Sequence, residues 1–140
     1  MTTRSSGFTL IELLVVVSII GILSAVGIVS YQGYVSGAKQ KSAENAMQQI
    51  SLAQTEEYSN AGEYYTSTTC SDPSEASEDS SKDIEKELFG GGDIITKESG
   101  YEICIAPDGT SYKIIASKFD SDGAVVKTIT LSANGVWTGK

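Results

Sequence analysis

The sequence predicts an α+β fold in which a long N-terminal helix packs against an antiparallel sheet of three or four strands. Three observations lead to this prediction: an apolar run near the N-terminus, a helical pattern that continues beyond it, and period-two patterning in the last third of the chain. The helix and the sheet each have one apolar side to bury, and packing them together buries both.

The first predicted element is an apolar run of 22 residues, 8–29, in which Glu12 is the only charged side chain. A helix needs about 20 apolar residues to cross a bilayer, so the run predicts contact with a membrane. Residues 1–7 are polar and carry one cation, Arg4, as the start of a targeting peptide does. The apolar part of a secretory signal is only about 7–15 residues long, so such a signal fits this run poorly.

The helix is predicted to continue to about Ser59, because no proline occurs before Pro73 and apolar residues recur at helical spacing. These residues are Ala43, Met47, Ile50 and Ala53. A helix of more than about 50 residues is about 75 Å long, which is too long for a domain of this size to bury. Its first half must therefore pack on lipid or on other copies of the chain.

The remaining elements follow from composition and alternation. Residues 60–99 predict an irregular connection, rich in Ser, Thr, Asp and Glu, with one short helix over 82–89 that ends at three glycines. Residues 100–140 alternate apolar and polar side chains and predict a meander. Its turn signals are Pro107-Asp108-Gly109, residues 120–123, and Asn134-Gly135.

The chain has two cysteines, Cys70 and Cys104. An even cysteine count after an export-type segment favours a disulfide and an oxidising compartment. A bridge that closes a loop of this length contributes about 3–4 kcal/mol in the chain-entropy model. The alternative is two buried free thiols.

The formal net charge of −8 is concentrated in residues 60–90, which contain eight acids and two lysines. This region should repel phosphates, and its simplest interpretation is a solvated surface. A strongly basic nucleic-acid footprint is absent. A local patch of Lys113, Lys118, Lys127 and Lys140 leaves nucleic-acid binding open without supporting it.

Signals for catalysis are missing, so we expect no enzyme and no cofactor. The chain has no histidine to serve as the base of a nucleophilic triad, and it has neither a Gly-x-Ser-x-Gly turn nor a Walker-type phosphate loop. Asp120-x-Asp122-Gly123 is similar to the start of a calcium loop, but Val125 occupies the position where an EF-hand needs glycine. We therefore expect a turn there and no metal site.

The segment Gly7-Phe8-Thr9-Leu10-Ile11-Glu12-Leu13 resembles the processing site of type IV prepilins and type II secretion pseudopilins. The resemblance covers residues 1–60 by pattern and the rest only in outline. It implies a pilin fold and cleavage between Gly7 and Phe8 by a prepilin peptidase, followed by N-methylation of Phe8. The expected parts are a leader, 1–7; a transmembrane and filament-core helix, 8–29; an amphipathic half-helix, 30–59; and a head, 60–140, with a connection over 60–99 and a meander over 100–140.

Glu12 needs a polar partner, because an ionisable side chain inside a bilayer is energetically costly. The resemblance implies that it pairs with the α-ammonium group of Phe8 in a neighbouring subunit, with Thr9 adding a hydrogen bond. A single buried polar contact would fix the register of helices that otherwise slide past one another. Alternatively, Glu12 lies near the helix end and reaches the lipid headgroups.

The expected function is that of a structural subunit of a type IV pilus. The resemblance implies an inner-membrane precursor that contacts lipid, then an extracellular helical homo-oligomer built by an assembly platform and a motor ATPase for adhesion, motility or DNA uptake. Two alternatives remain: a type II secretion pseudopilin, and a minor pilin that binds DNA or a surface. One departure from the family is Val29, which stands where many members carry a proline, so no proline kink is expected.

Overall fold

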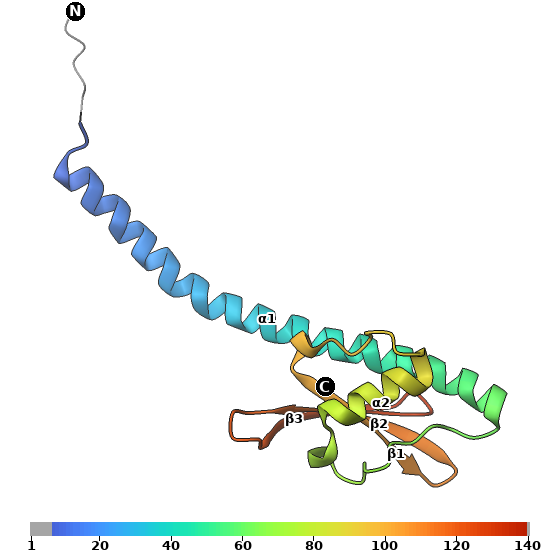
Figure 1. The fold of residues 1–140 in the computed structure, drawn as a ribbon. Coiled ribbons are helices and arrows are strands. Elements are labelled where there is room, and N and C mark those ends of the chain that lie inside the picture. Colours follow the sequence, from blue (N-terminus) through green and yellow to red (C-terminus); the bar gives the residue numbers. More distant parts are fainter. Residues whose placement is uncertain (1–6, 140) are drawn as a thin grey trace, which may run out of the picture. The chain divides into compact units, whose positions relative to one another are not determined.

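The computed structural model describes residues 7–139. The fold is α+β, as predicted: a long N-terminal helix and a four-stranded antiparallel sheet (Figure 1). The helices are α1 (Leu10–Ala61) and α2 (Glu78–Phe89), with short 3-10 turns at Pro73–Glu75 and Lys97–Ser99. The strands are β1 (Tyr101–Asp108), β2 (Ser111–Phe119), β3 (Val125–Ser132) and β4 (Trp137–Thr138).

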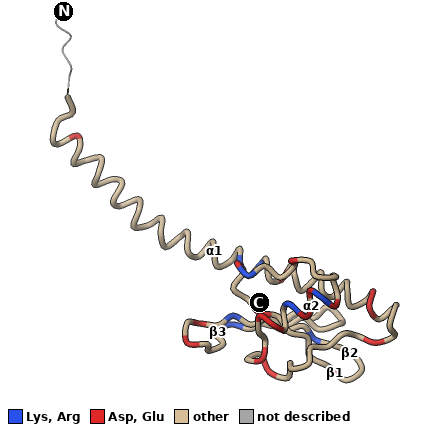
Figure 2. Tube along the Cα trace, viewed as in Figure 1, with Lys and Arg blue, Asp and Glu red and all other residues tan. Residues whose placement is uncertain are grey.

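The chain forms two compact units, residues 1–37 and 38–140. In the first unit, α1 is continuous through Gly27 and Gly33, and every residue from Phe8 to Tyr34 is exposed. This helix is long and apolar enough to cross a membrane. Figure 2 shows that charged residues gather in the second unit, and Glu12 is the only charged residue between Phe8 and Val29.

The second unit forms one main core between α1 and the sheet, and from here on we call this whole unit, residues 38–140 with the end of α1 included, the head. The strands follow the order β1-β2-β3-β4, and each pairs with the next in antiparallel fashion. From α1 the core takes Met47 and Ile50, both fully buried at helical spacing. From the sheet it takes alternating residues, which are Ile103, Ile105, Ile114, Ala116, Ile129 and Leu131. The buried side of α1 and the inward-facing residues of the strands thus form one apolar layer, as predicted.

The turn between β1 and β2 is shorter than the predicted Pro107-Asp108-Gly109. Pro107 pairs with Tyr112 and Asp108 with Ser111, so both belong to β1. The loop then holds only Gly109, whose φ of 64° favours glycine, and Thr110. Proline is tolerated in β1 because β1 is an edge strand.

Helix α2 begins four residues before the predicted Lys82. The cause is a capping box: the Ser80 backbone N–H donates to Ser77 Oγ at 3.2 Å, and the Ser77 N–H donates to Ser80 Oγ at 2.9 Å. Apolar periodicity gives no signal for the first turn of α2, because the residues of this turn are all polar. The predicted end is right, since Gly90 closes the helix in the left-handed conformation.

Gln54 fastens the segment after α1 to the helix itself. Its side chain is fully buried; its Nε2 donates to the Tyr65 carbonyl at 2.6 Å, and its Oε1 accepts from the Tyr65 N–H at 2.9 Å. Gln54→Ala should lower the free energy of unfolding of the head by about 1–3 kcal/mol, because both backbone groups lose their partner. Urea unfolding of the full chain in detergent measures this, with exposed Gln48→Ala as the control. Equal effects of the two substitutions would contradict it.

Candidate functional site

The start of α1 is built around Thr9 and Glu12. The Thr9 N–H and hydroxyl donate to Glu12 Oε2 at 2.8 and 2.7 Å, and the Glu12 N–H donates to Thr9 Oγ1 at 3.3 Å. This is a capping box, in which each side chain satisfies the other residue's backbone N–H at the helix N-terminus. The spacing Thr-x-x-Glu before an apolar run signals such a box, although Thr9 was predicted only to add a hydrogen bond at the contact between subunits.

The capping box leaves one carboxylate oxygen of Glu12 available. Both hydrogen bonds from Thr9 reach Oε2, and within residues 7–139 no hydrogen bond to Oε1 is formed. Glu12 lies in a shallow hollow lined by Phe8, Ile11, Val15 and Val16. The arrangement therefore presents a fixed acceptor on an otherwise apolar surface.

Three of the predicted site residues, Phe8, Thr9 and Glu12, thus lie together. Phe8 is 87% exposed and Leu10 is 88% exposed, so the site is open to a neighbouring molecule. Gly7 directly precedes it, while leader residues 1–6 lie outside the described part of the chain. Cleavage, methylation and assembly at these positions remain predictions.

Comparison of the chain with known protein families finds a match at its N-terminal end, which includes part of the apolar helix. Residues 2–28 match the family model for the prokaryotic N-terminal methylation motif. The chain carries the class III signal peptide of type IV pilins. No curated protein and no solved structure matches the chain significantly.

The methylation motif indicates a type IV pilin-like or pseudopilin protein. Such proteins are structural subunits and are usually not enzymes. Together with the apolar helix, the motif indicates a membrane-anchored precursor associated with a pilus or pseudopilus. The resemblance drawn from Gly7 to Leu13 is thereby confirmed.

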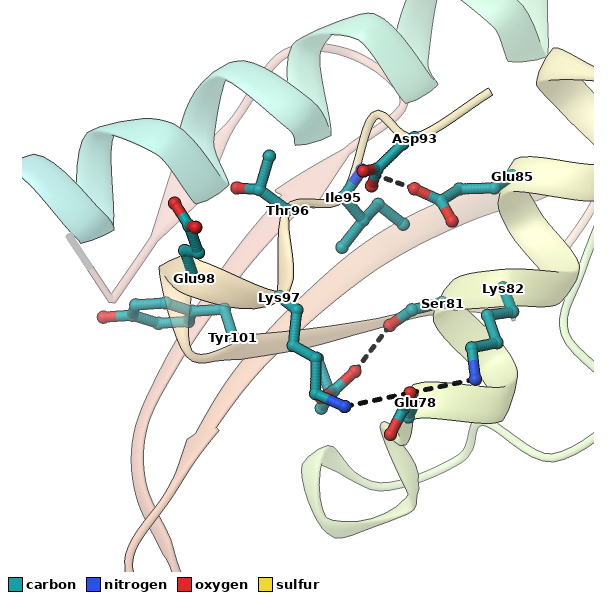
Figure 3. Close-up of a pocket in the computed structure, with 11 residues that line it drawn as sticks. Glu78, Ser81, Lys82, Glu85, Asp93, Ile95, Thr96, Lys97, Glu98 and Tyr101 are labelled. Atoms are coloured by element: carbon teal, nitrogen blue, oxygen red, sulfur yellow. Dashed lines mark hydrogen bonds and ion pairs between the residues drawn. The ribbon is translucent and has the colours of Figure 1, made fainter. Parts of the chain in front are cut away.

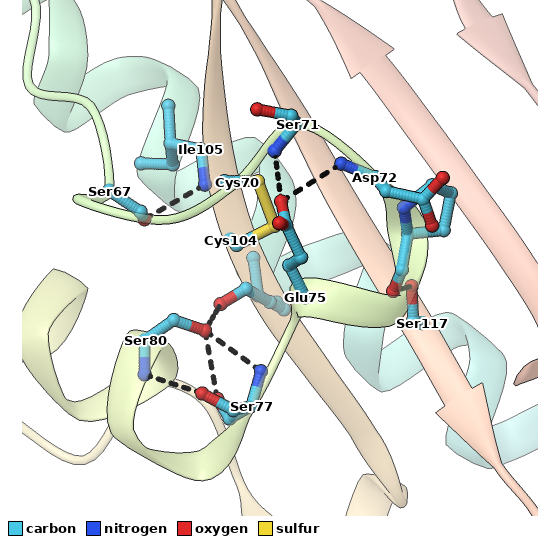
Figure 4. The surroundings of a disulfide bond; sticks show 12 residues. Ser67, Cys70, Ser71, Asp72, Glu75, Ser77, Ser80, Cys104, Ile105 and Ser117 are labelled. Carbon is cyan, nitrogen blue, oxygen red and sulfur yellow. Dashed lines mark hydrogen bonds between the residues drawn. A yellow bond between two sulfur atoms is a disulfide. The ribbon is translucent and has the colours of Figure 1, made fainter. Parts of the chain in front are cut away.

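Cys70 and Cys104 form a disulfide, as expected, and neither is a free thiol. Their Cα atoms are 5.8 Å apart, and both residues are buried (Figure 4). The bond joins the irregular segment after α1 to the middle of β1. A second apolar cluster surrounds it, formed by Ala76 from the irregular segment and by Ala106 and Ile115 from β1 and β2.

Three of the four lysines that left nucleic-acid binding open lie in the described residues, and they do not share one face of the sheet. Lys118 and Lys127 are opposite each other on β2 and β3, and Lys127 Nζ donates to Gln40 Oε1 at 2.6 Å. Lys113 lies five residues before Lys118 on the same strand, so strand alternation puts it on the other side of the sheet. Lys140 lies outside the described residues. This geometry does not favour a continuous basic surface for nucleic acid.

A polar depression lies between α2 and the start of β1 (Figure 3). At its rim Glu78 accepts from Lys82 at 2.9 Å and from Lys97 at 3.2 Å. Hydrogen bonds from Lys82 and Lys97 lower the pKa of the Glu78 carboxyl. Within the described residues, no group of three or more acidic or cysteine side chains is placed to hold a metal.

The Glu78 ion pairs predict a loss of stability in acid. Because the folded-state pKa of Glu78 lies below its ordinary 4.5, the contribution is present above that value and is lost as pH falls through the folded-state pKa. Glu78→Gln should therefore flatten the acid limb of stability against pH. Thermal unfolding from neutral pH to below pH 4.5 measures this, with exposed Glu56→Gln as the control. An acid limb of unchanged slope in Glu78→Gln would contradict it.

Proposed function

We propose that this chain is the structural subunit of a type IV pilus. It is inserted in the inner membrane as a precursor, cleaved between Gly7 and Phe8 by a prepilin peptidase, and methylated on the Phe8 nitrogen. An assembly platform and its motor ATPase then move it into a helical filament of identical subunits outside the cell. The observation that carries the proposal is the available Glu12 oxygen within the exposed apolar helix of the methylation motif.

Cleavage creates the partner that Glu12 lacks. The Phe8 nitrogen is an amide in the precursor and becomes an ammonium group once the Gly7–Phe8 bond is cut. This cation on one subunit pairs with Glu12 Oε1 on a neighbour, while Thr9 holds Oε2. Only a cleaved subunit can make the contact, so processing comes before assembly.

The apolar surface makes extraction from the membrane feasible. From Phe8 to Tyr34 the side chains are exposed, so in a bilayer they contact lipid. In a filament the same side chains contact other copies of the helix, which is also an apolar environment. Apolar surface is covered in the bilayer and in the filament alike, so apolar contact alone does not favour one register between subunits. The ion pair at Glu12 supplies that preference.

Processing is tested at the mature N-terminus. Gly7→Val should block cleavage, because a branched side chain hinders approach of the peptidase to the backbone, whereas the control Gly21→Ala should be processed normally. Mass spectrometry of the wild-type chain should show a terminus at N-methyl-Phe8. An intact Met1 or a cut elsewhere would overturn the proposal.

The methylation motif equally fits a type II secretion pseudopilin, which assembles by the same chemistry. Electron microscopy of sheared fractions separates the two, because long surface fibres are expected only of the pilus subunit. A secretion defect without fibres on deletion of the chain would favour the pseudopilin.

A further inference from the structure

Strand β1 forms one edge of the sheet. The outward backbone groups of an edge strand can pair with a strand from another chain unless something covers them. Here serine hydroxyls accept hydrogen bonds from three successive outward N–H groups. The bonds run from Tyr101 to Ser99 at 3.3 Å, from Ile103 to Ser81 at 3.0 Å, and from Ile105 to Ser67 at 3.1 Å.

The outward carbonyls at two of these positions are covered as well. The Ile103 carbonyl accepts from Ser80 Oγ at 2.8 Å, and the Ile105 carbonyl accepts from the Ser67 N–H at 2.9 Å. The next outward residue is Pro107, which has no N–H to offer. The outward backbone groups of β1 are thus hydrogen-bonded to serine side chains and to the Ser67 backbone, and not to another strand.

The contacts that cover Ile103 and those that cover Ile105, which together we call the cover of β1, are held in place by different parts of the head. Ser80 and Ser81 belong to α2, which Ile84 fixes in the main core with a fully buried side chain. Ser67 instead lies in segment 66–76, which is irregular except for the 3-10 turn Pro73–Glu75 and of which only Ser67, Cys70 and Ala76 are buried. Ordering such a segment costs conformational entropy at every residue, and little apolar burial offsets it.

The disulfide is the strongest tie of this segment to the sheet. Cys70 follows Ser67 by three residues, and Cys104 lies in β1 between Ile103 and Ile105 (Figure 4). The segment also contacts β2, through the hydrogen bond from Ser117 Oγ to the Pro73 carbonyl at 2.6 Å and through the packing of Ala76 in the second apolar cluster with Ile115. The covalent bond therefore sits beside the contact that covers Ile105.

We propose that the Cys70–Cys104 disulfide is a redox-dependent lock on the half of the β1 edge at Ile105, while α2 keeps the half at Ile103 closed independently. A dithiol reductant supplies two electrons and two protons; the S–S bond becomes two thiols, and the reductant becomes a disulfide. Residues 66–76 then leave the strand without unfolding of the head, while Ser77 continues to cap α2. The N–H and carbonyl of Ile105 then become exposed to solvent.

The lock is tested by amide hydrogen exchange of the full chain in detergent, labelled with nitrogen-15 at isoleucine and followed by NMR. Reduction with a dithiol should accelerate exchange of the Ile105 amide by at least about tenfold, since a disulfide typically contributes more than that factor requires. The Ile103 and Ile114 amides should accelerate by a smaller factor than the Ile105 amide, because α2 and the central strand stay in place and these amides respond only to the loss of global stability that removing the bridge causes.

Two serine variants of the oxidised chain supply the matched comparison. Ser67→Ala should accelerate exchange at Ile105 alone, and Ser81→Ala at Ile103 alone. Cys70→Ala combined with Cys104→Ala should reproduce the reduced pattern without reductant. Equal acceleration of all isoleucine amides would mean general destabilisation, and unchanged exchange at Ile105 would mean that the cover holds without the disulfide; either result overturns the proposal.

Discussion

Replacing Glu12 by valine should abolish filaments while leaving the subunit in the membrane, with its leader removed. Valine removes the only charged side chain from residues 8–29, so insertion should not suffer. The substitution removes the acceptor that we propose for the Phe8 ammonium group of a neighbour, and the register between subunits would then be unspecified. Immunoblots of sheared fractions and of membranes measure the two pools separately.

Ser18→Ala is the control for this experiment. Ser18 is also a polar, exposed residue of the same helix, but its hydroxyl donates to the Leu14 carbonyl of its own chain at 2.7 Å. Its hydrogen bond is already satisfied within the helix, so the variant should assemble normally. Abundant wild-type-like filaments from Glu12→Val would refute the assembly contact, and retention of the leader in that variant would mean that Glu12 acts in processing.

Ile50→Ala should destabilise the head by about 2–5 kcal/mol, the usual cost of deleting a fully buried aliphatic side chain. Ile50 comes from α1 and lies in the same core as the strand residues Ile105, Ile114 and Ile129. The cavity would therefore open between the helix and the sheet.

Two residues along the same helix, Leu52 is 73% exposed, so Leu52→Ala makes a similar change without a cavity. Its effect should stay within about 0.5 kcal/mol. Urea unfolding of both variants, followed by the fluorescence of Trp137, compares them directly. Similar losses would show that helix α1 does not stabilise the head through this core.

Patterning predicted the parts of the fold that depend on regular periodicity. Met47 and Ile50 mark the buried side of α1, and alternation from Tyr101 onward marks β1. Local polar chemistry was harder to read. The early start of α2 depends on a hydrogen-bond exchange between Ser77 and Ser80, which hydrophobic periodicity does not register.

The candidate site was predictable only in part, for a similar reason. The run from Gly7 to Leu13 is contiguous, so it could be recognised as a string, and its capping box was readable from spacing. The cover over β1 was not, because Ser67 and Ile105 are separated by 38 residues and meet only through the folded head. The sequence around a serine in a polar stretch does not indicate which distant backbone group its hydroxyl will contact.

The core of the head draws on opposite ends of the unit, with Met47 near its beginning and Leu131 near its end. In the proposed export of the head, the apolar side of α1 therefore stays uncovered until β3 has crossed the membrane. Contacts so distant along the chain form slowly compared with local ones. Cys70 and Cys104 both emerge before β2 and β3, so the pair can meet an oxidant while the sheet is still incomplete. In this proposed order of events, the core of the head can form only after β3 has been exported, although α1 is complete earlier.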